Sequence, residues 1–363
     1  MDCSSQHTSQ QQVPDLDWEL VLGLLPNGWD EQARQLGAFQ RPRKVKDPQG
    51  LLRLVLMHCG AGLSFQRTAE AARCTQLATM AKASVWERVQ RVGPWLNWML
   101  TAMLAERVSA AQIADYRPRA VDATAINGPN NRLQHRLHYS ISVASLSCDD
   151  LVISDVRKPE RLEHFSVVSG DLLIGDRIYA KAKGIAAVKR AKGDVIVRLG
   201  RTSLALYDAT GARLDWLAWL RQASSDQLVE RFAQFPDSDG RWITGRLCAV
   251  RLSEQQAEKA RCRCRRAAQR KQTKLHDATL EAAGYVCVFT TVPADRLSTR
   301  MILRLYRARW QIELAFKRLK SLLRADQLRE TTAESALIWL QGKLLYALLL
   351  QACLKHAGAF SPR

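Results

Sequence analysis

The change of pattern near Arg119 constrains the fold of this chain most. Three short segments, "RAVDATAI", "LHYSISVAS" and "DLVISDVRK", are rich in β-branched residues and follow one another closely. Such spacing is typical of a meander of adjacent strands. Beyond them, "PERLEHFSVVSG" predicts a helix, "DLLIGDRIY" a buried strand, "AKAKGIAAVKRAKG" a helix and "DVIVRLG" another strand. Three strands followed by alternating helices and strands predict an α/β fold, with a mixed sheet flanked by helices.

The segment before this change, from Trp18 to about Arg107, has helical patterns. "SFQRTAEAARC" and "SVWERVQRVGPWLNWML" predict two helices, and Ser84 with Glu87 matches a capping box in the second. Two such helices form either a helix-turn-helix DNA reader or an ordinary bundle. We expect residues 1–108 to be a helical N-terminal DNA-binding domain.

The segment beyond Leu199 has a different pattern, in which two predicted strands lie on either side of a basic stretch. "RWITGRLCAVRLS" and "YVCVFTTV" have strand patterns, and a strongly basic helix or arm lies between them. We therefore expect residues 109–198 to form the first part of the α/β domain and 199–293 a mainly β insertion. Residues 294–363 would complete the domain and add C-terminal helices.

Positive charge exceeds negative charge by 19 at pH 7. Such an excess suits a polyanionic partner, either nucleic acid or an anionic membrane surface. In the basic helix we expect Arg263, Arg265 and Arg266 to bind phosphates, a solvated charged face being the alternative. The start "MDCSSQHTSQQQ" is no secretory signal, and residues 341–343 interrupt the apolar C-terminal segment with polar groups. We expect a cytoplasmic protein that does not enter a membrane.

Three carboxylates stand in positions that need an explanation. Asp122 lies among apolar and small residues inside the first strand, and a buried charge must be paired, hydrogen-bonded or metal-bound. Asp176 follows "LLIG" at the carboxyl end of a strand, where functional groups of α/β sheets gather. Glu313 lies in "YRARWQIELAFKRLK", which predicts one amphipathic helix.

That helix has a polar edge beside an apolar stripe. At about 100° per residue, the edge within an arc of roughly 60° consists of Tyr306, Arg309, Glu313 and Lys320. The apolar stripe, which would hold the helix against a core, consists of Leu305, Ala308, Ile312, Phe316 and Leu319. Taken alone, the edge is equally explained by an ordinary ion pair between Arg309 and Glu313.

The three acids converge if the first and fourth strands are neighbours and the helix packs across them. Divalent cations relieve the mutual repulsion of such a cluster, and oxygen ligands suit Mg²⁺ or Mn²⁺. Two ions about 3.5–4 Å apart can activate water and stabilise the leaving oxygen of a phosphodiester. We therefore expect two Mg²⁺ or Mn²⁺ ions per active site, with the basic surface holding the substrate.

Together the motifs resemble those of DDE transposases of bacterial insertion sequences. "YRARWQIELAFKRLK" is similar to the Tyr-x2-Arg-x3-Glu-x6-Lys signature of one large group, while "VDATAI" and "GDRIYA" resemble its two aspartate segments, in the same order. The resemblance covers about Arg119 to Leu349. It implies a ribonuclease-H-like catalytic domain. It also implies metal ligation by Asp122, Asp176 and Glu313, and DNA contacts by Tyr306, Arg309 and Lys320.

The resemblance further implies a reaction and its partners. The reaction is cleavage at the transposon ends and strand transfer, through a hairpin intermediate. The partners are double-stranded DNA, as terminal repeats and as target, and a second subunit in the synaptic complex. Trp242 is the candidate for stacking on a displaced base, a core tryptophan being the alternative. Group members usually continue further beyond "KLLYALLL". An inactive DNA-binding regulator of transposition and a stand-alone metal-dependent DNA nuclease are therefore alternatives.

Overall fold

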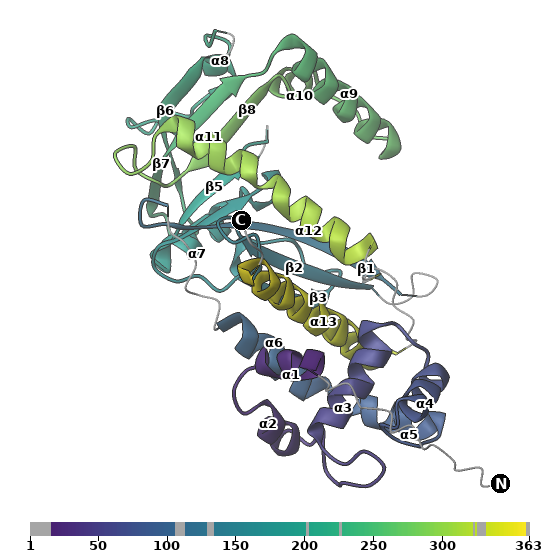
Figure 1. Cartoon of the computed structure of the whole chain (residues 1–363). Coiled ribbons are helices and arrows are strands. Elements are labelled where there is room, and N and C mark those ends of the chain that lie inside the picture. Colours follow the sequence, from purple (N-terminus) through teal and green to yellow (C-terminus); the bar gives the residue numbers. More distant parts are fainter. Residues whose placement is uncertain are drawn as a thin grey trace, which may run out of the picture. The chain divides into compact units, whose positions relative to one another are not determined.

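The computed structural model describes residues 16–105, 113–128, 134–200, 203–224, 227–321, 324 and 332–360 (Figure 1). The chain divides into two compact units. One unit consists of residues 1–103 and 337–363, and the other of residues 104–336. The finer four-part division expected from the sequence stays a prediction.

An eight-stranded sheet forms the centre of the second unit. Its strands are β1 (Arg117–Asn127), β2 (Gln134–Ser142), β3 (Cys148–Asp155), β4 (Asp171–Gly175), β5 (Asp194–Arg198), β6 (Leu228–Pro236), β7 (Trp242–Arg251) and β8 (Tyr285–Thr290). Their order in the sheet is β3-β2-β1-β4-β5-β8-β7-β6. The neighbours β1, β4 and β5 are parallel, whereas the other neighbouring pairs are antiparallel. The predicted mixed α/β sheet is confirmed.

Helices cover both faces of this sheet (Figure 1). In β4, Leu173 belongs to the core beneath α7 (Ala182–Arg190), while Leu172 and Ile174 belong to the core beneath α11 (Thr299–Ala308). Successive side chains of a strand point to opposite faces, so an uninterrupted apolar strand is buried on both. The segment between β5 and β8 adds three helices, α8 (Trp216–Leu220), α9 (Glu254–Arg270) and α10 (Asp277–Ala282).

The helix expected over "PERLEHFSVVSG" is wrong. The segment contains only one 3-10 turn, η4 (Leu162–His164). Aspartate side chains accept hydrogen bonds from backbone amides that would otherwise bond within a helix. The amide of Ser166 donates to Asp150 at 2.8 Å, and the amide of Val168 donates to Asp171 at 2.9 Å. These bonds to carboxylates hold the segment extended against the sheet.

The single helix expected over residues 306–320 is two helices. α11 ends at Ala308 and α12 (Trp310–Ser321) begins after Arg309, whose backbone is still right-handed. The backbone hydrogen bonds at this junction span three residues. The amide of Arg309 donates to the carbonyl of Tyr306 at 3.1 Å, and the amide of Ile312 donates to the carbonyl of Arg309 at 3.0 Å. The expected apolar stripe is largely confirmed. Its buried members are Leu305, Ile312, Phe316 and Leu319.

The first unit is helical. Its elements are α1 (Leu16–Gly23), α2 (Trp29–Gln35), α3 (Pro48–Val55), the π-helix η1 (Leu56–Gly60), α4 (Phe65–Cys74), α5 (Lys82–Gln90), α6 (Gly93–Ala105) and most of α13 (Ala333–Phe360). The capping box expected at Ser84 is wrong, because α5 already begins at Lys82. The second predicted helix is divided into α5 and α6, which begins at Gly93. Ser64 does cap α4, because its hydroxyl accepts from the amide of Arg67 at 3.2 Å.

Helix α13 is long and apolar enough, in length and composition, to cross a membrane. However, 61% of its most apolar window is buried inside the protein. The buried residues include Gln341 and Lys343, the polar groups that interrupt the apolar run. The Lys343 ammonium donates to the carbonyl of Gly60 at 2.8 Å. The helix therefore has the burial of a core helix.

Candidate active site

Two aspartates lie at the same level on adjacent strands. β1 and β4 are parallel neighbours, and Ala120 stands opposite Ile174 in their register. Asp122 and Asp176 each follow these paired residues by two positions. The Asp176 carboxylate accepts from the amide of Ile178 at 2.8 Å and so starts the 3-10 turn η5 (Arg177–Tyr179). The expected adjacency of the first and fourth strands is therefore present.

Asp122 is held in a poor environment for a negative charge. Burial, together with the nearby carboxylates of Asp176 and Glu160, raises the pKa of its carboxyl group to about 7. The amide of Ala123, which donates to Asp122 at 2.8 Å, and the guanidinium of Arg309 act in the opposite direction. A cation at this position would relieve the cost of the charge.

Arg309 lies between two of the expected metal ligands. One guanidinium nitrogen, Nη2, is 2.6 Å from Oε1 of Glu313, and the other, Nη1, is 3.9 Å from Oδ2 of Asp122. Glu313 extends from the first turn of α12, and its side chain is more than half exposed. The ion pair that was the alternative explanation of the polar edge is thus present, and the same guanidinium also reaches toward Asp122.

The donor atoms fit a hard divalent cation, although their present spacing does not form a closed ligand set. Asp122, Asp176 and Glu313 offer only carboxylate oxygens, which magnesium and manganese prefer. Within the described ranges, no three His, Cys, Asp or Glu side chains are grouped closely enough to hold a metal ion. Displacement of Arg309 would bring a cation between the acids.

Tyr306 and Lys320 differ in their surroundings. Tyr306 is buried in the core beneath α11, and the guanidinium of Arg309 lies 5.9 Å from the centre of its ring. Its ring therefore supports Arg309 from the protein side. Lys320 lies half-buried in the last turn of α12, about 10 Å along the helix from Glu313 at 1.5 Å per residue.

Two residues of this site were missed by sequence reasoning. Glu160 pairs with Arg136 at 3.1 Å. Burial raises the pKa of Glu160, the positive charge of Arg136 opposes this, and the negative charge of Asp176 adds to it. Tyr179 is buried, and its hydroxyl has no hydrogen-bond partner among the described residues. Burial raises the Tyr179 pKa, and the negative charges of Asp122, Glu160 and Asp176 add to this. No local signal in the sequence points to either residue, because each comes close to the site through tertiary contacts.

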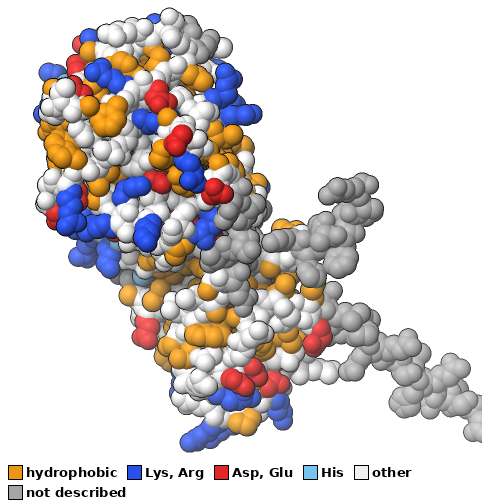
Figure 2. Space-filling view, turned by 90° about the vertical axis from the view of Figure 1, so that its left-hand side faces the viewer, with side chains coloured by type: hydrophobic (Ala, Val, Ile, Leu, Met, Phe, Trp, Pro, Cys, Tyr) orange, Lys and Arg blue, Asp and Glu red, His pale blue; other side chains and the backbone are white. Residues whose placement is uncertain are grey.

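The basic helix α9 divides its arginines into paired and unpaired groups. Arg265 contacts Glu258 at 2.7 Å, and Arg261 contacts Glu254 at 2.6 Å. Arg263 and Arg266 instead line a shallow cavity of about 440 Å³ together with Gln269 and Arg270. Lys and Arg side chains also recur over the face of the molecule in Figure 2, so positive charge is not confined to α9.

Trp242 begins β7 and is 48% exposed. Its ring stands edge-on to that of Tyr207, with 5.4 Å between the ring centres. The alternative of a core tryptophan is therefore wrong. About half of the side chain is accessible to a partner.

Comparisons with known proteins agree with these observations. The family described as Transposase DDE domain matches residues 155–349. The chain is 32% identical over 356 residues to the InsL protein of insertion sequence element IS186A from Escherichia coli (strain K12), covering 96% of each chain. It is also 32% identical to the transposase for insertion sequence element IS421 from Escherichia coli, again covering 96% of each. A solved synaptic complex of piggyBac transposase with hairpin DNA superposes with a TM-score of 0.44 at 7% identity, covering 96% of this chain and 77% of that chain.

The family match includes Asp176 and Glu313, and it begins after Asp122. The two bacterial relatives extend the similarity over nearly the whole chain, including β1. Both the matched length and the identity are sufficient to assign the family. The chain therefore belongs to the DDE-domain transposases of bacterial insertion sequences, and it is an enzyme that cleaves DNA and transfers DNA strands.

Proposed function

We propose that Asp122, Asp176 and Glu313 are the catalytic residues and bind two Mg²⁺ or Mn²⁺ ions. The observation that carries this proposal is the β1–β4 register, which sets Asp122 and Asp176 side by side, with Arg309 linking Asp122 to Glu313. When bound, the ions would activate the attacking water or hydroxyl and neutralise charge on the reacting phosphate. The protein's part is to hold three carboxylates on rigid elements and to withdraw Arg309 from between them.

A ribonuclease-H-like catalytic domain belongs to the same proposal. A three-strand antiparallel meander, β1 to β3, is joined by the parallel strands β4 and β5, and the two aspartates lie on β1 and after β4. The insertion in this proposal is residues 199–293, which contain the strands β6, β7 and β8 as well as the helices α8, α9 and α10. Its strands β6 and β7 extend the same sheet. The YREK signature is represented by Tyr306, Arg309, Glu313 and Lys320.

The DNA partners in this proposal are the transposon terminal repeats and the target. Arg309 and Lys320 would contact phosphates near the cleaved end, and Arg263, Arg265 and Arg266 would hold the backbone farther away. Tyr306 would act by supporting Arg309, and Trp242 by stacking on a displaced base. Two copies would assemble in the synaptic complex. The burial of α13 supports a cytoplasmic enzyme that does not enter a membrane.

Glu313→Gln tests the catalytic assignment. Glutamine keeps the size of the side chain but removes a charged ligand, so cleavage of transposon-end DNA in Mg²⁺ should fall by several orders of magnitude. Specific DNA binding should remain, because phosphate contacts by arginines and lysines dominate affinity. The measurement is a cleavage and joining assay beside a binding assay on the same DNA.

Glu334→Gln is the matched control, because Glu334 is an exposed acid at the start of α13. It should cut and join normally. Normal cleavage by Glu313→Gln would refute the assignment. Cleavage by the unaltered enzyme without joined products would favour the stand-alone nuclease, and specific binding with no cleavage would favour the regulator.

A further inference from the structure

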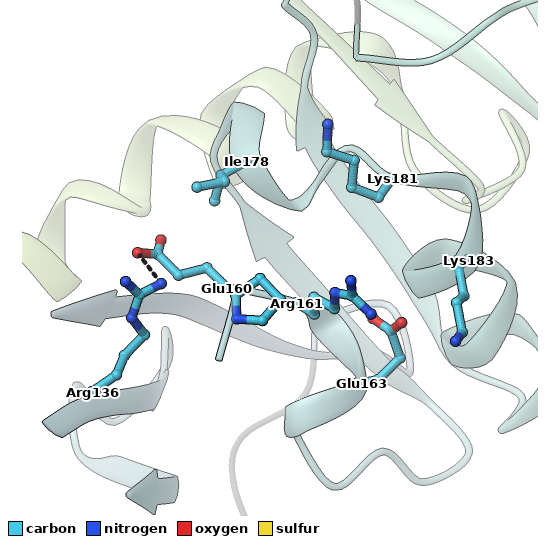
Figure 3. Close-up of a pocket in the computed structure, with 8 residues that line it drawn as sticks. Arg136, Glu160, Arg161, Glu163, Ile178, Lys181 and Lys183 are labelled. Atoms are coloured by element: carbon cyan, nitrogen blue, oxygen red, sulfur yellow. Dashed lines mark ion pairs between the residues drawn. The ribbon is translucent and has the colours of Figure 1, made fainter. Parts of the chain in front are cut away.

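A second charged site lies beside the proposed catalytic carboxylates. It is a cavity of about 370 Å³ (Figure 3). The residues that line it are Arg136, Pro159, Glu160, Arg161, Glu163, Ile178, Lys181 and Lys183. Arg136 and Glu160 lie at one end of the view, and Lys183 lies at the other. Ile178, which lines the cavity, follows Asp176 by two residues in the chain.

The cavity lies on the face of the sheet opposite α12. Asp122 stands opposite Tyr139 in the β1–β2 register, and the Tyr139 ring is 5.7 Å from that of Phe316 on α12. Arg136 precedes Tyr139 by three positions, so its side chain points to the other face. There it pairs with Glu160. The strands β1 and β4, which position Asp122 and Asp176, thus lie between the cavity and Lys320 of α12.

Positive charge predominates in this cavity. Arg136 is balanced by Glu160 at 3.1 Å. Lys181 and Lys183 are exposed, and neither forms an ion pair within the part of the chain that the structure describes. Lys181 is also the N-cap residue of α7, without a side-chain cap. Arg161 and Glu163 also line the cavity, and their charges offset each other. The two lysines therefore give the hollow next to the catalytic edge a net positive charge.

We propose that this cavity binds backbone phosphates of a DNA strand that passes over the catalytic edge. The inference rests on the proposed function, because it places the second anchor relative to the same carboxylates. Arg309 and Lys320 would hold the strand on the α12 face, and Lys181 and Lys183 would hold it on the α7 face. A strand gripped on both sides of the reacting phosphate is fixed in position and orientation. The strand is either the sequence flanking the transposon end or the target.

The test compares two double variants of α7, each built in the Glu313→Gln background so that DNA is not cut. The test variant is Lys181→Gln with Lys183→Gln. The control is Arg190→Gln with Lys192→Gln, which removes two exposed cations at the opposite end of the helix. Binding is measured from low to high salt on two DNAs, a transposon-end duplex with its flank and an unrelated target duplex.

The expected result is a smaller salt dependence for the Lys181 and Lys183 variant on at least one DNA. Each lost phosphate contact reduces the slope of log affinity against log salt by about 0.9, so two contacts correspond to about 1.8. A reduction on the end duplex alone assigns the flank, and a reduction on the target as well assigns a strand common to both. Thermal melting should be unchanged in both variants.

Equal slopes for the test and control variants on both DNAs would overturn the proposal. This outcome is separable from failure of the catalytic assignment. If Glu313→Gln still cuts DNA, the metal ligands are wrong, whereas the salt slopes concern binding and do not depend on cleavage.

Discussion

At the scale of single residues, Arg309 has the most consequential position. Its guanidinium contacts Glu313, approaches Asp122 and lies against the ring of Tyr306. The positive charge partly offsets the cost of ionised Asp122. A divalent cation between the acids would have to displace it, and a DNA phosphate is a natural alternative partner for the freed guanidinium. Metal loading and DNA binding would then assist each other.

Arg309→Ala is expected to tighten Mn²⁺ binding to the DNA-free protein. Removal of a positive charge about 4 Å from the ligands favours a second cation by on the order of tenfold or more, even with strong screening. Manganese affinity can be measured by electron paramagnetic resonance. Arg307→Ala, an exposed neighbour on α11, serves as the control and should leave the affinity unchanged. Weaker Mn²⁺ binding by Arg309→Ala would contradict this view of the site.

At the scale of elements, the sequence pattern predicted the strands and helices whose formation depends on neighbouring residues in the chain. The strands around Asp122 and Asp176 were predicted because "VDATAI" is rich in β-branched residues and "LLIG" is a short apolar run. The helix over residues 159–170 was wrong because carboxylates bind its amides: Asp150, 16 residues before Ser166, and Asp171, three residues after Val168. Helical periodicity does not reveal such partners. The junction at Arg309 has neither glycine nor proline to mark it. Glu160 and Tyr179 were missed because their proximity to the site depends on these tertiary contacts.

Helix α9 provides a prediction at this scale. Arg263→Gln with Arg266→Gln should reduce the salt dependence of DNA binding more than Arg261→Gln with Arg265→Gln. Glutamates already neutralise the second pair, whereas the first pair lines the open cavity. The slope of affinity against salt on a long duplex is the measurement. If the two double variants have equal effects, α9 is a solvated charged face and does not bind phosphates through Arg263 and Arg266.

At the scale of the whole molecule, the two ends of the chain build one helical unit. Residues 337–363 cluster with residues 1–103. The contact is close: a β-carbon added at Gly342 of α13 would lie 2.5 Å from the β-carbon of Cys59. The sequence predicted α13 only as one of the C-terminal helices that follow the catalytic domain, because periodicity alone does not identify the partner of an apolar helix.

Gly342→Ala should therefore lower the melting temperature, although alanine is the better helix former. The crowding against Cys59 is expected to cost about 1–3 kcal/mol, which exceeds the gain of roughly 1 kcal/mol from helix propensity. Calorimetry of the whole chain measures the effect. Gly23→Ala is the control, because an added β-carbon there meets nothing within 4 Å. A rise in melting temperature for Gly342→Ala would show that the contact is looser than described.

The adjacency of β5 and β8 has a consequence for how such enzymes diverge. The chain passes from the end of β5 at Arg198 into a segment whose strands β6 and β7 extend the sheet, and it comes back at Tyr285 beside β5. The amide of Leu199 donates to the carbonyl of Cys287 at 2.9 Å. Both ends of the intervening segment are therefore anchored at neighbouring points. Mutation and selection can lengthen, shorten or recharge that segment while Asp122, Asp176 and Glu313 keep their geometry. The requirement is that some strand continues to cover β8, since an uncovered edge invites aggregation. The contacts of this segment with the DNA backbone can thus evolve independently of the chemistry of cutting.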